Sequence, residues 1–101
     1  MLVVRFTVPV KAGGEKAFVE WIRSRSDYGI PHPPYGERVY WYKFAPWCEV
    51  IHEMEFENLT QYEAHREKQK AASGYRDWVS KVGEFYVRGG RSEVWNVEQF
   101  D

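Results

Sequence analysis

With 101 residues, the chain has room for one folded domain and for no independent second one. Hydrophobic residues make up 44% and aromatic residues 18% of the chain, which is enough to form a core and excludes a wholly disordered protein. The 14 basic residues nearly balance the 15 acidic ones without long runs of one sign, so we expect no nucleic-acid partner and no membrane partner.

Residues 2–10 alternate between apolar and mixed positions, which predicts a first strand. Its apolar face carries Leu2, Val4, Phe6, Val8 and Val10. The opening segment is too short to cross a bilayer and lacks the basic start and cleavage site of a secretion signal. Because the only cysteine, Cys48, allows no intrachain disulfide, we expect a reducing, cytoplasmic location.

A first helix is predicted after the glycine-containing connection at residues 11–14. Its inner face carries residues at helical spacing, namely Ala17, Phe18, Trp21, Ile22 and Arg25. The following segment, residues 26–36, contains three prolines and two glycines, which oppose regular structure. We expect a loop there, and its Tyr28 and Tyr35 make it a candidate lid.

Two adjacent strands are predicted over residues 38–44 and 49–57, with a turn at residues 45–47. In the first, Tyr40, Tyr42 and Phe44 share one side, and Val39, Trp41 and Lys43 share the other. In the second, Val50, His52, Met54 and Phe56 alternate with Glu49, Ile51, Glu53, Glu55 and Glu57. We expect these strands to pair antiparallel, with the His52 row facing the helices.

A second helix is expected from Thr60 to a break at Gly74, because Thr60 and Glu63 have the spacing of a capping box. A further helical segment follows, in which apolar residues recur at spacings of three and four. They are Tyr75, Trp78, Val79 and Val82. Glycines 89–90 end this segment, and residues 92–100 predict a last strand.

The order β-α-β-β-α-β predicts an α+β protein with the ferredoxin-like split βαβ plan over residues 1–101: an antiparallel four-stranded sheet with helices on one face. The opposite face would then carry an apolar patch, which soluble monomers rarely expose. Its expected members are Val3, Val39, Trp41, Ile51 and either Val94 or Trp95. On the same face, Arg5 and Lys43 are expected to lie opposite Glu53 and Glu55 of a neighbouring strand or subunit. We therefore expect a homodimer formed through this face.

No strong catalytic signature occurs, since the sequence has no glycine-rich phosphate loop, no GxSxG and no HExxH. The spacing of His32, His52 and His65 matches no metal motif, so we expect no metal site. His52 lies in an apolar row and needs a polar partner. It is either a hydrogen-bonded core histidine or a residue that binds a ligand or transfers a proton.

His65 lies on the second predicted helix, with Tyr62 three residues before it and Gln69 four residues after it. If this face turns inward, it lines a polar cavity between helix and sheet; if the alanines of the helix turn inward, His65 is solvated. Aromatic residues of the predicted interior form either a pocket for a planar ligand or simply core. They are Phe18, Trp21, Tyr40, Tyr42, Phe44 and Trp78.

Two segments resemble dimeric α+β barrel proteins of the antibiotic-biosynthesis-monooxygenase and NIPSNAP types. CEVIHEMEFENLTQYEAH resembles their central strand and helix start, and VPVKAGGEKAFVEWI resembles their first strand, turn and helix. The resemblance implies a homodimer whose sheets face each other, with a ligand pocket between sheet and helices. A helix histidine of several relatives corresponds to His65. Haem-degrading relatives use an asparagine on the first strand, which LVVRFTVPV lacks, so the resemblance does not extend to haem degradation.

We therefore expect a protein that binds a small hydrophobic or aromatic molecule, with a cofactor-independent monooxygenase acting on an aromatic or polyketide-like substrate as the leading activity. No metal or flavin would be needed. The candidate catalytic residues are His65 and His52, and the candidate ligand-binding residues are Tyr40, Tyr42, Tyr62, Trp78 and Trp21. The alternative is a non-catalytic ligand-binding or interaction domain. An RNA-binding sheet is a third hypothesis, which the acidic strand at residues 49–57 disfavours.

Overall fold

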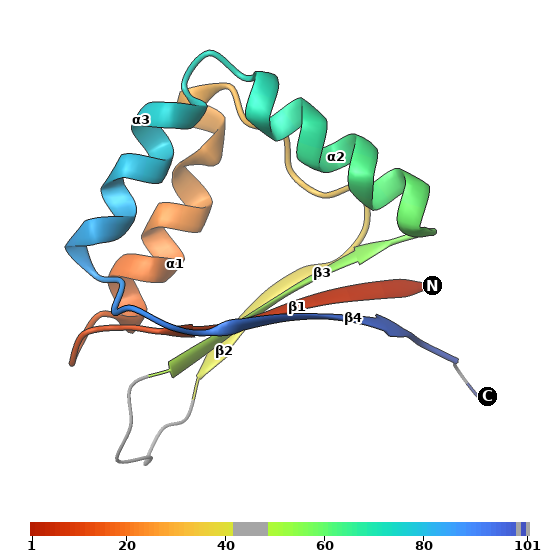
Figure 1. Cartoon of the computed structure of the whole chain (residues 1–101), viewed down its shortest axis with the longest axis horizontal. Coiled ribbons are helices and arrows are strands. Elements are labelled where there is room, and N and C mark those ends of the chain that lie inside the picture. Colours follow the sequence, from red (N-terminus) through yellow and green to blue (C-terminus); the bar gives the residue numbers. More distant parts are fainter. Residues whose placement is uncertain (42–48, 99, 101) are drawn as a thin grey trace.

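The helices of the chain all lie on one face of a four-stranded antiparallel sheet (Figure 1). The structure is a computed structural model, and it describes residues 1–41, 49–98 and 100. The strands are β1 (Leu2–Pro9), β2 (Glu37–Trp41), β3 (Glu49–Phe56) and β4 (Arg91–Asn96), in the spatial order β2-β3-β1-β4. This order is that of the ferredoxin-like plan, so the predicted fold is confirmed.

The helices form two groups above the sheet (Figure 1). Helix α1 (Glu15–Arg23) continues into the 3-10 helix η1 (Ser24–Tyr28), and α3 (Tyr75–Ser80) continues into η2 (Lys81–Glu84). These two helices lie side by side over one end of the sheet, whereas α2 (Leu59–Ala71) covers the other end. None of the described helices is long and apolar enough to cross a membrane.

The side chains of the two central strands, β1 and β3, alternate between the two faces of the sheet as predicted. β1 and β3 pair Val4 with Met54 and Phe6 with His52, and these side chains face the helices. The buried apolar residues form two clusters. The larger one, against α1 and α3, contains Val10, Phe18, Ile22, Ile30, Val50, Trp78 and Phe85, and the smaller one, near α2, contains Leu2, Val4, Met54 and Phe56. Each fully buried aliphatic side chain contributes about 1.5–3 kcal/mol to stability.

The predicted faces of β2 are wrong by one residue. Val39 pairs with His52 and Trp41 with Val50, so both share the helix side of the sheet, while Tyr40 pairs with Ile51 and lies on the opposite, outer face. Each row of this strand combines a charged residue with a bulky aromatic one, Glu37 with Trp41 and Arg38 with Tyr40, so its own pattern did not indicate which row faces the helices. A shift of one residue moves every side chain to the other face. The predictions for Tyr42, Lys43, Phe44 and the turn at residues 45–47 lie outside the described residues.

Helix α2 begins one residue earlier than predicted and has a different cap. Asn58 is the N-cap, and its Oδ1 accepts a hydrogen bond of 2.9 Å from the backbone N–H of Gln61. The Gln61 side chain accepts in turn from the N–H of Glu57 at 2.6 Å. The capping role predicted for Thr60 is therefore wrong, because Asn58 already supplies the acceptor.

The polar face of α2 turns inward. His65 is buried, whereas Ala64 and Ala71 of the same helix are exposed. Of the two orientations left open by the sequence, the structure has the one in which Tyr62, His65 and Gln69 face the sheet. Such a helix does not seal a dry core, and a pocket remains beneath it.

The segment predicted as a loop and candidate lid is anchored in its first half. Residues 26–28 belong to η1, and Ile30, 2% exposed, packs into the larger core cluster. Tyr28 also packs against this cluster, and Tyr35 is exposed without lining the pocket. The loop prediction thus holds only from Gly29 onward, and neither tyrosine covers the pocket.

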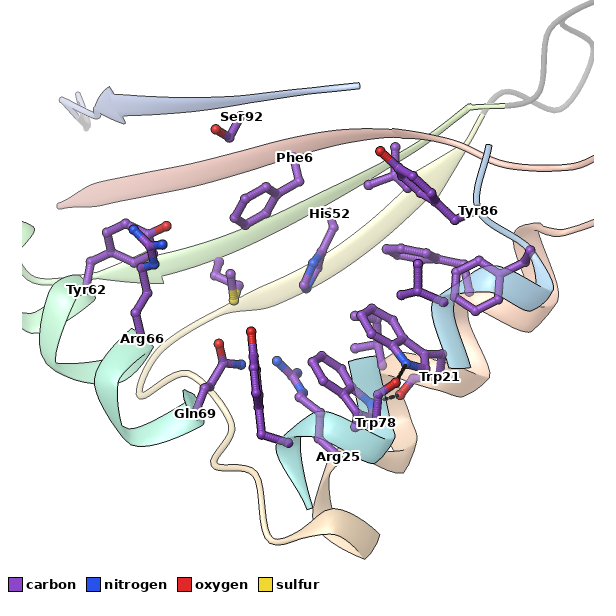
Figure 2. Close-up of a pocket in the computed structure, with 17 residues that line it drawn as sticks. Phe6, Trp21, Arg25, His52, Tyr62, Arg66, Gln69, Trp78, Tyr86 and Ser92 are labelled. Atoms are coloured by element: carbon purple, nitrogen blue, oxygen red, sulfur yellow. Dashed lines mark hydrogen bonds between the residues drawn. The ribbon is translucent and has the colours of Figure 1, made fainter. Parts of the chain in front are cut away.

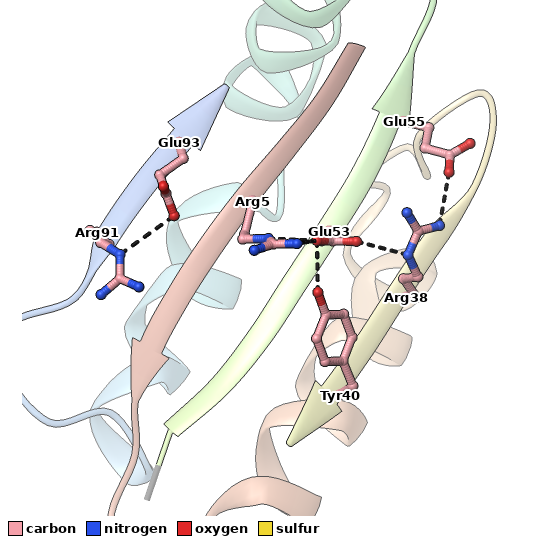
Figure 3. Close-up of polar contacts among 7 residues, drawn as sticks. All are labelled: Arg5, Arg38, Tyr40, Glu53, Glu55, Arg91 and Glu93. Carbon is pink, nitrogen blue, oxygen red and sulfur yellow. Dashed lines mark hydrogen bonds and ion pairs between the residues drawn. The ribbon is translucent and has the colours of Figure 1, made fainter. Parts of the chain in front are cut away.

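On the outer face, Glu53 is the centre of an ion-pair network (Figure 3). It is 3% exposed and accepts hydrogen bonds from Arg5 Nε at 2.6 Å, Arg38 Nε at 2.8 Å and the Tyr40 hydroxyl at 2.7 Å. Burial by itself raises the pKa of Glu53, but these hydrogen bonds outweigh it, so that the pKa is lowered. The predicted cross-strand pairing of Arg5 with Glu53 is confirmed.

Candidate functional site

A pocket of about 390 Å³ lies between the helix side of the sheet and the helices (Figure 2). Phe6 and His52 point into it from the sheet, and the other walls come from α1, α2, α3 and η2. The volume is within the range of about 300–1,000 Å³ that is typical of sites for small organic ligands. The fold therefore offers a concave site to which β1, β3, β4 and the helices contribute side chains.

One wall of the pocket is an aromatic pair. The indole rings of Trp21 on α1 and Trp78 on α3 stack with centroids 3.8 Å apart and an interplanar angle of 5°. Phe18 and Phe85 contact this pair edge-on or tilted and extend the apolar wall. The arrangement is rigid because the rings are held between two packed helices, and it is suited to a planar ligand.

The opposite wall is polar and comes from α2. Tyr62, Arg66 and Gln69 line the pocket from one stripe of the helix, since residues four and seven apart share a face. The Arg66 guanidinium lies 5.8 Å from the centre of the Tyr62 ring, a cation–π contact. Figure 2 shows these three side chains on one side of His52, and Trp21 and Trp78 on the other.

A cluster of polar and charged side chains, two of them buried, forms the floor between the two walls. His52, 6% exposed, places Nε2 at 2.7 Å from Oε2 of Glu37 on the neighbouring strand β2. Arg25, 1% exposed, donates from Nη2 to the other oxygen of Glu37. The Nη2 atom also lies 3.4 Å from Nδ1 of His32. The partner that His52 needs is thus Glu37, and both His52 and Arg25 line the pocket.

Glu37 is held in its charged form by its two partners. Burial by itself raises the pKa of Glu37, but the hydrogen bonds from His52 and Arg25 outweigh it and lower the pKa to about 2. A carboxylate that accepts from Nε2–H fixes the tautomer of a neutral imidazole, which leaves the lone pair on Nδ1. In this state His52 can accept a proton.

His65 lies beside the pocket and does not line it. Its ring packs 5.3 Å from the ring of Phe56, and Nε2 has no hydrogen-bond partner among the described residues. Burial, followed by the positive charge of Arg25, lowers the pKa of His65. The ring is therefore neutral at pH 7 and belongs to the packing under α2.

The structure brings together only part of the predicted site. His52, Tyr62, Trp21 and Trp78 line the pocket, and their binding roles stay predictions. Tyr40 was predicted to line it but lies on the outer face, because the register of β2 differs by one residue. Tyr42 lies outside the described residues.

Sequence reasoning missed the roles of Arg25, Glu37 and Arg66. Arg25 continues the inner stripe of the first helix, and a charged residue in such a stripe is a signal that a buried partner exists. Glu37 and Arg66 gave no comparable signal. Within residues 1–41 and 49–98, no group of three or more His, Cys, Asp or Glu side chains is arranged to hold a metal ion.

No family model and no curated protein matches the sequence. Solved structures do resemble the fold. Protein Atu4242 from Agrobacterium tumefaciens superposes with a TM-score of 0.80 at 15% identity, over 99% of this chain and 96% of that one. An uncharacterized NIPSNAP domain protein from Burkholderia xenovorans superposes with a TM-score of 0.73 at 15% identity, over 100% of this chain and 98% of that one.

A putative antibiotic biosynthesis monooxygenase from Nitrosomonas europaea superposes with a TM-score of 0.65 at 18% identity, over 96% of this chain and 98% of that one. Both types of protein named by the sequence resemblance thus recur among the structural neighbours, which confirms the resemblance at the level of the fold. Identities this low establish the fold alone and assign no activity.

Proposed function

We propose that the protein binds a planar aromatic small molecule in the pocket and that His52 acts there as the general base of a cofactor-independent monooxygenase. One observation carries this proposal: a histidine oriented by a half-buried carboxylate lines an aromatic-walled pocket. The fold shared with antibiotic biosynthesis monooxygenase proteins is consistent with it.

Binding follows from the shape and composition of the pocket. A planar ring system inserted beside the Trp21–Trp78 pair would exchange water for aromatic and aliphatic surface, which stabilises the complex by about 25 cal/mol per Å² of apolar area buried. The strand below the ligand places His52 within the same pocket. A hydroxyl on the ring system would then lie near the imidazole.

The chemistry needs a base and a substrate that can donate electrons. His52 takes a proton from an activated CH₂ or phenol group of the substrate, and Glu37 stabilises the imidazolium that forms. The resulting carbanion reduces O₂ and combines with it to give a peroxide. The peroxide loses water as the imidazolium returns its proton, so that CH₂ and O₂ become C=O and H₂O. The substrate supplies all of the electrons, and one oxygen atom enters the product.

The alternative is a non-catalytic ligand-binding domain, and one observation favours it. His52 is buried and bonded to Glu37, which is also what a structural core histidine requires. The two proposals differ only in whether the bound ligand is converted.

We also propose that the protein forms a homodimer through the outer face. Trp95 and Tyr40 are 49% and 38% exposed on this face. Trp95 pairs in register with Val3, and Tyr40 pairs with Ile51, so two aromatic–aliphatic pairs lie on either side of the ion pairs around Glu53. A second copy that covers these rings would remove them from water.

Oxygen uptake with a dihydroxyanthrone as probe tests the activity. The wild type is expected to accelerate formation of the quinone, which is followed by its absorbance, and His52→Gln is expected to reduce the rate about 10²-fold or more. His65→Leu is the matched control, because that histidine lies outside the pocket, and it should keep the rate. Tight binding of the probe without faster oxidation would favour the non-catalytic alternative.

A further inference from the structure

The lining of the pocket carries positive charge without an acidic residue. Among the described residues that line it, two are arginines, Arg25 and Arg66, and none is aspartate or glutamate. Glu37 lies behind His52 and balances one positive charge through its ion pair with Arg25. One guanidinium thus remains without a balancing carboxylate at the pocket.

That guanidinium is Arg66. None of the ion pairs among the described residues involves it, and within this part of the chain its guanidinium makes a cation–π contact with the Tyr62 ring at 5.8 Å. The side chain is exposed at the rim and projects from the stripe of α2 that faces the pocket. Gln69 lies almost one turn further along the same stripe and offers amide N–H donors.

Arg25 adds an unsatisfied donor deeper in the site. The residue is 1% exposed, and its Nε has no hydrogen-bond partner among the described residues. A buried donor without a partner is costly, and an acceptor on a bound ligand would satisfy it. The two arginines and the Gln69 amide therefore offer several donors to a bound ligand, and none of these three side chains is negatively charged.

Arg66 and Gln69 lie across the pocket from the stacked indoles, whereas Arg25 lies beside Trp78 (Figure 2). We propose that the ligand is an aromatic carboxylate, with its ring system against Trp21 and Trp78 and its carboxylate on Arg66. The inference rests on the proposed function, since it assigns the anionic group to the same aromatic ligand. A planar guanidinium binds a carboxylate through two parallel hydrogen bonds, which also fixes the orientation of the ring relative to His52.

Calorimetric titration with a matched pair of probes tests the inference. Hydroxynaphthoate carries the carboxylate, and hydroxynaphthamide has nearly the same shape without the charge. The wild type should bind the acid about tenfold more tightly than the amide. Arg66→Gln should remove this preference, whereas Lys68→Gln, which removes an equal charge from the same helix outside the pocket, should keep it. Thermal melts check that both variants are folded.

Equal affinities of the wild type for the two probes would overturn the anion inference and leave aromatic binding in place. A preference that survives in Arg66→Gln would overturn it as well. If neither probe binds the wild type, the proposed function fails, and the inference fails with it.

Discussion

Trp21 and Trp78 bind each other reciprocally across the interface of α1 and α3. Nε1 of Trp21 donates to the backbone carbonyl of Trp78 at 2.8 Å, and Nε1 of Trp78 donates to the carbonyl of Trp21 at 2.9 Å. The two rings stack at 3.8 Å between these hydrogen bonds. Two residues that are 57 positions apart in the chain thus fix the helix pair and, with it, the aromatic wall of the pocket.

Trp78→Ala is expected to lower the free energy of unfolding by about 3–5 kcal/mol, because it removes a buried indole and leaves the carbonyl of Trp21 without its donor. Urea denaturation followed by circular dichroism measures the change. Trp41→Ala is the control, since this residue is 49% exposed, and it should cost less than about 1 kcal/mol. Equal losses in the two variants would contradict the structural role of the pair.

Glu37 makes stability depend on acid pH. Its pKa is about 2 in the folded chain, against an ordinary value of 4.5, so the folded state resists protonation of this carboxylate. The stability that Glu37 contributes is therefore complete above about pH 5. We expect the free energy of unfolding to fall by about 2 kcal/mol between pH 5 and pH 2. This fall is smaller than the full pKa shift would give, because the carboxylate is partly exposed.

The unfolding midpoint in urea, measured across this pH range, checks the expectation. Glu53, whose pKa is also lowered, likewise contributes stability that is lost as the pH falls, and it remains in the variant. Glu37→Gln should therefore show a shallower pH dependence, not a flat one. A variant whose pH dependence equals that of the wild type would rule out the proposed charge state of Glu37.

His65 makes stability depend on pH nearer neutrality. Because its pKa is lowered from 6.5 in the folded chain, the unfolded state binds the proton more readily, and stability falls as the pH drops below about 6.5. His65→Leu removes both this proton and the unpartnered Nε2, so it should be close to the wild type at pH 7.5 and more stable than it at pH 5. Thermal melting of the wild type and of His65→Leu at pH 5 and pH 7.5 measures the difference. An equal loss of stability in the variant at both pH values would show that the His65 ring has a hydrogen-bond partner.

Trp95→Glu tests the homodimer. The substitution replaces an exposed aromatic side chain of the outer face by a charge, so it should dissociate a dimer formed there. Light scattering at micromolar concentration should give a dimer mass for the wild type and a monomer mass for the variant. Val94→Glu is the control, since it is similarly exposed but lies on the helix side of β4. A monomer mass for the wild type would contradict the proposed homodimer.

The central strands and the fold were predictable because their residues carry a local pattern. β1 and β3 have one apolar row each, and that row indicates the buried face regardless of the partner strand. β2 has two bulky rows, and its face depends on pairs such as Val39 with His52 that only the folded sheet makes. Its orientation therefore could not be deduced from its own residues.

The candidate site was predictable only in part for a related reason. His52 stood out because a polar ring interrupts an apolar row, and the need for a partner was correctly inferred. The identity of that partner depends on the register of β2, which places Glu37 beside His52, and its second ion-pair partner, Arg25, comes from η1. Contacts between three separate elements leave no spacing signature in the sequence.

The protonation state of His52 with a ligand bound tests the central claim most directly. Long-range ¹H–¹⁵N spectra of the imidazole distinguish its tautomers, and titration with naphthol shows which nitrogen meets the ligand. We expect the Nε2–H tautomer in the free protein, fixed by Glu37, and a large shift of Nδ1 when naphthol binds, while the signals of His65 move little. Naphthol binding that leaves both nitrogens of His52 unshifted would contradict the account.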